Sequence, residues 1–139
     1  MKVSIGSILL CLIGTCALSG AKVGLMSLEK IRPGMAGVWK TSVSGTEIRN
    51  FNMRVLGISK NFLGPKRSII LCEALDKEHQ QTGPVAGMSG SPVYIDGKLI
   101  GAYAYGFTWS KNQAVFGVTP IHDMLEMLEV PADVSVARS

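Results

Sequence analysis

The stretch that decides the fold is Gly87-Met88-Ser89-Gly90-Ser91-Pro92, followed directly by Val93-Tyr94-Ile95-Asp96-Gly97-Lys98-Leu99-Ile100-Gly101-Ala102. An Asp-Gly pair between two apolar runs is a strong short-range signal for a β-hairpin. We therefore predict that Ser91–Ile95 and Lys98–Tyr105 form two strands that pair across Asp96-Gly97. A hairpin at this point indicates a sheet protein in which the glycine-rich hexapeptide is the loop that enters a strand.

The hexapeptide places Ser89 next to glycines and three residues before a proline. A nucleophilic serine needs a tight turn that exposes its hydroxyl, and backbone N–H groups aimed at the developing oxyanion. Gly87 and Gly90 permit the backbone conformations of such a turn, and Pro92 favours an extended exit from it. The alternative is a Gly/Ser-rich loop without chemistry. The strand that follows disfavours an α/β-hydrolase, which needs a helix after its serine.

The spacing G-x-S-G-x-P is that of the nucleophile loop of chymotrypsin-like serine proteases. There the oxyanion hole consists of the N–H groups of the serine and of the glycine two residues before it. Ser89 is therefore the candidate catalytic nucleophile, and the N–H groups of Gly87 and Ser89 are the candidate oxyanion hole. We expect the loop to present the Ser89 hydroxyl to solvent.

The segment from Gly83 to Met124 resembles the sporulation stage IV protein B (SpoIVB) family of serine peptidases. The resemblance is carried by Val85–Ala102 and Phe116–Ile121 and, more weakly, by Ile31–Gly37 and Phe51–Ile58, which are similar to the start of secreted bacterial relatives. It implies a trypsin-like β fold and a serine endopeptidase with a peptide or protein substrate, in which Ser89 matches the family nucleophile.

The histidines depart from that family pattern. Family proteases carry a histidine well upstream of the serine, whereas Phe51–Ile58 contains none, and the chain has only His79 and His122. His79 lies in a polar segment and is the candidate base if that segment folds back over Ser89; otherwise it is an exposed polar residue. We expect neither histidine within hydrogen-bond reach of Ser89, and so a weakly active or inactive chain.

A second hypothesis is a non-catalytic β-barrel that binds a peptide or an envelope partner through an open sheet edge. The missing histidine favours it. Four aromatic residues would either form its recognition surface or fill the core of a small barrel. They are Trp39, Tyr103, Tyr105 and Trp109.

The predicted fold class is mainly β: a trypsin-like, partial β-barrel with a short C-terminal helix. The expected strands are 37–43, 47–58, 68–75, 91–95, 98–107 and 114–118, and the polar segment 76–83 is expected to be exposed and to hold one helical turn. Thr119 is expected to cap the last helix with Pro120 at its first position. Its apolar stripe, which we interpret as a packing face, is Ile121, Met124, Leu125 and Leu128.

The chain has 139 residues. A two-barrel protease needs about 200, within the range of a single β domain. The chain is therefore either a fragment of a longer protease or a reduced one-barrel form. We divide it into a signal peptide (1–21), a peptidase-like domain (22–130) and a tail (131–139).

The N-terminus has the pattern of an export signal: Lys2, an apolar stretch from Ile5 to Leu18, and small residues at Ser19-Gly20-Ala21. We expect a periplasmic or extracellular protein, with membrane attachment only if this segment is not cleaved. The net charge of +4 is scattered, with no basic cluster longer than Lys66-Arg67, so a nucleic-acid partner is not expected. Cys11 and Cys16 both lie in the signal segment, so its removal leaves Cys72 without a disulfide partner, and we interpret Cys72 as a buried thiol. We expect no metal or cofactor.

Overall fold

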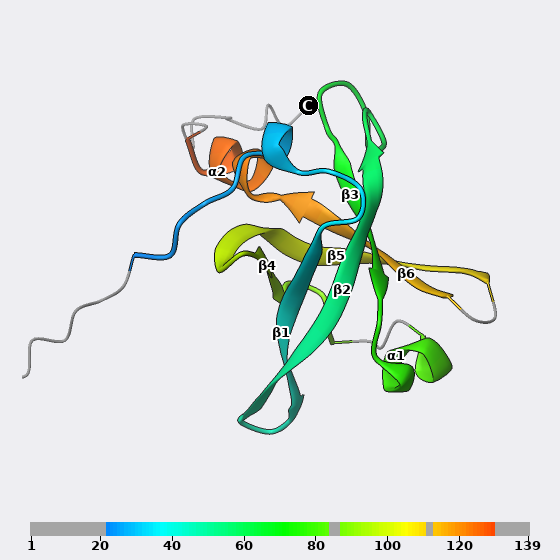
Figure 1. Cartoon of the computed structure of the whole chain (residues 1–139). Coiled ribbons are helices and arrows are strands. Elements are labelled where there is room, and N and C mark those ends of the chain that lie inside the picture. Colours follow the sequence, from blue (N-terminus) through cyan, green and yellow to red (C-terminus); the bar gives the residue numbers. More distant parts are fainter. Residues whose placement is uncertain (1–21, 84–86, 111–112, 130–139) are drawn as a thin grey trace, which may run out of the picture.

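The computed structural model describes residues 22–83, 87–110 and 113–129, and in this part of the chain six antiparallel strands close into one barrel (Figure 1). The strand order is β1-β2-β3-β6-β5-β4. The strands are β1 (Ala36–Ser44), β2 (Glu47–Ser59), β3 (Ile69–Ala74), β4 (Pro92–Ile95), β5 (Lys98–Ser110) and β6 (Gln113–Pro120). The helices are η1 (Leu28–Lys30), α1 (Lys77–Thr82) and α2 (Ile121–Glu129). The predicted barrel with a short C-terminal helix is confirmed.

The β4–β5 hairpin is present where the Asp-Gly pair predicts it. Ile95 pairs with Lys98, and both residues of the turn have positive φ, +50° at Asp96 and +71° at Gly97. A two-residue hairpin turn with two positive φ angles matches the right-handed twist of its strands. Asp96 is therefore explained by its position in the turn.

The interior of the barrel is filled by aromatic and branched side chains. Along β2 the buried residues Phe51, Met53 and Val55 alternate with exposed neighbours, as one face of a strand requires. The fully buried Trp39 ring lies 4.9 Å from Phe116, between ring centroids, and Tyr103 stacks on Phe116 at 4.6 Å. Trp39 and Tyr103 thus belong to the core rather than to a recognition surface. Tyr105 is half-buried, and the Trp109 side chain lies outside the described part.

Gly101 sits where β5 lies against both β4 and β6, opposite Val93 and Pro120. A Cβ atom at this position would overlap the backbone carbonyl of Thr119. Because backbone cannot rotate away as a flexible side chain can, only glycine fits without a shift of β6. The identity of this residue is therefore set by the closure of the barrel.

The last helix differs from its prediction in its first residue and in its packing face. Thr119 and Pro120 belong to β6, so α2 begins at Ile121, and Thr119 is not its cap. Ile121 and Met124 are half-buried, but Leu128 is 81 % exposed. The helix lies on β5 and β6 only through its first turns, which is why the second half of the expected packing face is in solvent. No helix within the described residues is long and apolar enough to cross a membrane. The expected signal peptide and its cleavage site lie outside them.

Candidate active site

The serine loop is a tight turn that is tied to the barrel. The Ser91 N–H donates to the Met88 carbonyl (3.1 Å), and Gly90, at φ +88°, occupies the turn position that requires a positive φ. The Gly90 N–H donates to the Tyr103 carbonyl (2.7 Å), and the Tyr103 N–H donates to the Ser91 carbonyl (2.8 Å). Met88 on one side is buried, so Ser89 stands at the exposed apex.

The N–H groups of Gly87 and Ser89 donate no hydrogen bond to any acceptor within the described residues. Gly87 has φ +100°, and both residues are exposed. Donors of this kind remain available to a ligand oxygen, which is the property that an oxyanion hole needs. The assignment of these two groups, and of Ser89 as nucleophile, stays a prediction.

An open groove of about 480 Å³ runs past Ser89. Its wall is formed by the last part of β1, the start of β4 and the serine loop. The lining residues are Lys40, Thr41, Ser42, Ile48, Gly87, Ser89, Gly90, Ser91, Pro92 and Tyr94. The Lys40 ammonium lies over the Tyr94 ring, 5.2 Å from its centroid. The groove is therefore mostly uncharged, with one cation on its β1 side.

His79 is buried against the core, and the expectation of an exposed polar histidine is wrong. Its ring meets Phe51 and Trp39 edge to face, at centroid distances of 4.3 and 5.0 Å, and its Nε2 lies 3.2 Å from the Met88 Sδ. The polar residues around His79 predict exposure, but α1 is laid across the aromatic core so that this one side chain points inward. No periodic apolar pattern in the segment signals it.

The buried position of His79 controls its protonation. Desolvation lowers its pKa below the ordinary value of 6.5, while the nearby carboxylates of Glu78 and Asp76 oppose the shift. A thioether sulfur only accepts hydrogen bonds, so a hydrogen bond from His79 to Met88 requires the imidazole proton on Nε2. Nδ1 is buried and has no partner among the described residues. The ring is therefore a neutral part of the core.

The structure does not join a base to the serine. Within the described residues, no hydrogen bond links the Ser89 hydroxyl to any side chain, and His79 directs Nε2 at Met88 instead. The hollow that His79 lines shares Gly87 and Ser42 with the groove, so the ring is near the loop but turned inward. His122 is exposed on α2. Asp76 accepts from Asn52 of β2, a structural role.

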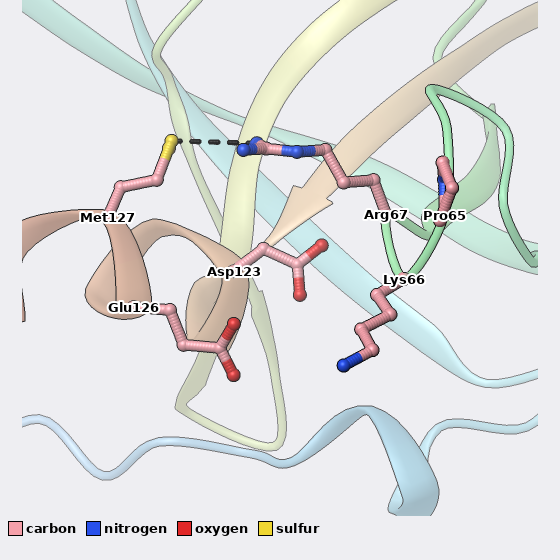
Figure 2. A pocket seen from close by; sticks show the side chains of 6 residues that line it. All are labelled: Pro65, Lys66, Arg67, Asp123, Glu126 and Met127. Carbon is pink, nitrogen blue, oxygen red and sulfur yellow. Dashed lines mark hydrogen bonds between the residues drawn. The ribbon is translucent and has the colours of Figure 1, made fainter. Parts of the chain in front are cut away.

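A second hollow lies at the other end of the barrel, between α2 and the β2–β3 connection. Figure 2 shows its lining: Pro65, Lys66, Arg67, Asp123, Glu126 and Met127. Arg67 Nη1 lies 3.6 Å from the Met127 Sδ. Figure 1 places this end opposite to the β1–β2 turn and α1. The hollow shares no described lining residue with the groove at Ser89, and this lining holds no serine, threonine or cysteine.

The described part of the chain shows neither a metal-binding cluster nor a reactive thiol. It holds no cluster of three or more His, Cys, Asp or Glu side chains that would bind a metal ion. Cys72 is fully buried in β3, and desolvation raises the pKa of its thiol to about 12. A buried thiol of this kind is inert at neutral pH, as expected from the sequence.

The closed antiparallel barrel and the exposed serine in a glycine turn are the features expected of a serine peptidase-like domain. Comparison with family models identifies the family: residues 15–125 match the model described as SpoIVB peptidase S55, and the chain belongs to this family. The family indicates a peptide or protein substrate. No curated protein matches the chain.

Proposed function

We propose that this chain is an exported serine endopeptidase domain in which Ser89 attacks the peptide carbonyl. The N–H groups of Gly87 and Ser89 stabilise the negative charge that develops on the carbonyl oxygen. The observation that carries the proposal is the turn itself: it exposes Ser89, leaves these two donors without an acceptor among the described residues, and borders an open groove.

The arrangement of His79 implies slow turnover by this domain alone. A serine hydroxyl is a weak nucleophile until a base removes its proton. A positioned base contributes about 10²–10⁴-fold to rate. His79 would have to leave its place between Trp39, Phe51 and Met88 to serve, and burial of its ring disfavours that movement. We therefore propose residual activity that rests on the oxyanion donors.

A fluorophosphonate probe tests this proposal because it reacts with activated serines. We expect slow labelling of the purified chain, with the adduct on Ser89 in a peptide map. Ser89→Ala should abolish it. Ser91→Ala is the matched control, since Ser91 lies in the same turn but is buried. Labelling of another serine, or rapid labelling at the rate of a complete triad, would contradict the proposal.

The core position of His79 favours a second candidate, the non-catalytic peptide-binding module. In that case the serine loop would bind a carbonyl oxygen without cleaving the chain. Complete absence of a Ser89 adduct, together with saturable binding of an unfolded polypeptide, would select this candidate over the first.

Export is part of the proposal and has its own measurement. If residues 1–21 act as a cleaved signal peptide, intact-mass spectrometry of the exported protein should show a chain that begins near Lys22. Full-length protein recovered from the cytoplasm in soluble form would contradict export.

A further inference from the structure

β1 is paired along only part of its length on the side of β4. The strand runs to Ser44, but its pairs with β4 are only Val38 with Tyr94 and Trp39 with Val93. On its other side, β1 stays paired with β2 to the end of the hairpin. Within the described residues, the segment from Lys40 to Ser44 therefore has no strand partner on the β4 side. The β1–β4 ladder is thus short, with two residue pairs, although the barrel that these residues form is closed.

Pro92 accounts for the interruption. Continuing the register past Trp39 and Val93 would set Pro92 opposite Lys40, and proline has no N–H to donate. The chain before Pro92 then leaves the sheet for the serine turn, which is bonded to Tyr103 of β5 instead. The same proline that gives the serine loop its exit thus ends the β1–β4 ladder.

The free part of β1 faces the groove. The Met35 carbonyl accepts from the Val55 N–H, so this carbonyl points toward β2. Because N–H and C=O groups alternate between the two sides of a strand, those of Lys40 and Ser42 point away from β2. Both residues line the groove that also contains Ser89. Unpaired strand donors and acceptors thus lie in the same groove as the exposed serine.

We propose that this groove is the substrate-strand site: an extended peptide adds to β1 beside Lys40–Ser42, and its backbone passes Ser89. The inference rests on the proposed function, because the family indicates a peptide or protein substrate. Strand addition draws affinity from main-chain hydrogen bonds and so accepts many sequences. Lys40 is the one charged residue of the described lining, which favours peptides with acidic side chains.

Binding of fluorescein-labelled casein, an unfolded and acidic polypeptide, tests the site by fluorescence anisotropy in a Ser89→Ala background that prevents cleavage. Ser42→Pro removes an edge N–H and should weaken binding about tenfold, the loss of roughly one hydrogen bond at an interface. Asn50→Pro is the matched control. Asn50 lies opposite Lys40 in the same hairpin, is exposed and does not line the groove, so its variant should bind normally. Equal affinities for the two proline variants would overturn the proposal.

A charge reversal keeps the test decisive if Ser42→Pro does not fold, which circular dichroism would reveal. Lys40→Glu should weaken casein binding several-fold, whereas Lys60→Glu, the same charge change on the exposed end of the β2–β3 connection, should not. Equal effects would show general electrostatics and overturn the site. The two proposals can fail separately. A Ser89 adduct in the wild type together with unaltered casein binding by the groove variants would reject only the groove. Altered casein binding without a Ser89 adduct would reject only the assignment of Ser89 as nucleophile.

Discussion

The imidazole Nε2 of His79 lies 3.2 Å from the sulfur of Met88, the residue that precedes the exposed Ser89. His79, the candidate base, thus contacts the residue next to the candidate nucleophile, but within the described residues it makes no hydrogen bond to Ser89 itself. Met88 and His79 face the core, whereas Ser89 faces the groove. This contact ties α1 to the inner side of the serine loop, so the histidine acts in this arrangement as a support for the loop.

Stability should fall in mild acid because of His79. Its pKa is lowered in the folded protein by burial, against the pull of Glu78 and Asp76 and with the help of Arg49, so the unfolded chain binds the proton more readily. The stabilisation is complete above the unfolded value of 6.5 and is lost as pH falls from there through the lowered folded pKa. Urea unfolding between pH 7 and pH 5 should show a smaller loss for His79→Phe than for the wild type. His122→Phe on exposed α2 is the control, and identical slopes for all three proteins would contradict the argument.

The oxyanion assignment predicts a specific effect of Gly87→Ala. Gly87 has φ +100°, a conformation that costs a residue with Cβ about 1–3 kcal/mol, although a Cβ there would meet no atom of the described residues within 4 Å. Relaxing this strain rotates the N–H groups of the loop. Fluorophosphonate labelling of Ser89 should slow by about 10²-fold or more, the usual cost of losing one oxyanion donor.

The matched control is Gly64→Ala on the β2–β3 connection. Gly64 has φ +120° and equally open surroundings, so the substitution produces similar strain away from the loop. Its labelling rate should equal that of the wild type. A similar slowing in both variants would point to a general loss of folded protein.

Barrel closure at Gly101 should be sensitive to one methyl group. Gly101→Ala sets a Cβ against the Thr119 carbonyl, so β6 must shift, and we expect a loss of about 1–3 kcal/mol in the free energy of unfolding. Gly57→Ala in β2 is the control, because a Cβ there meets no atom within 4 Å in the part of the chain that the structure describes. Denaturant titration of both variants measures the difference. Equal stabilities would show that β6 adapts without cost.

Cys72 should resist thiol reagents in the folded protein. It is fully buried in β3, and its pKa of about 12 leaves almost no thiolate at neutral pH. In a variant with Cys11 and Cys16 changed to serine, an aromatic disulfide reagent should report no accessible thiol before denaturation and one thiol after it. Prompt reaction of the native protein would mean that β3 opens readily.

The sequence predicts the parts of this fold that depend on neighbouring residues. The Asp96-Gly97 turn and the exposed Ser89 follow from turn residues whose preferences act over a few positions. The inward turn of His79 could not be predicted this way, because it depends on aromatic residues from β1 and β2 that are distant in the chain. The free edge of β1 could not be predicted from the sequence either, because it arises from the register between β1 and Pro92 of β4.

Tyr103 has a consequence for how the serine loop moves. Its main-chain N–H and C=O bond to Ser91 and Gly90, while its ring is stacked in the core on Phe116. Opening the loop therefore requires breaking β5 away from its neighbours, a sub-global event rather than a loop fluctuation. The amide protons of Gly90 and Tyr103 should exchange with solvent deuterium as slowly as those of the central strands. The loop that carries Ser89 would then keep its conformation for as long as the barrel stays folded.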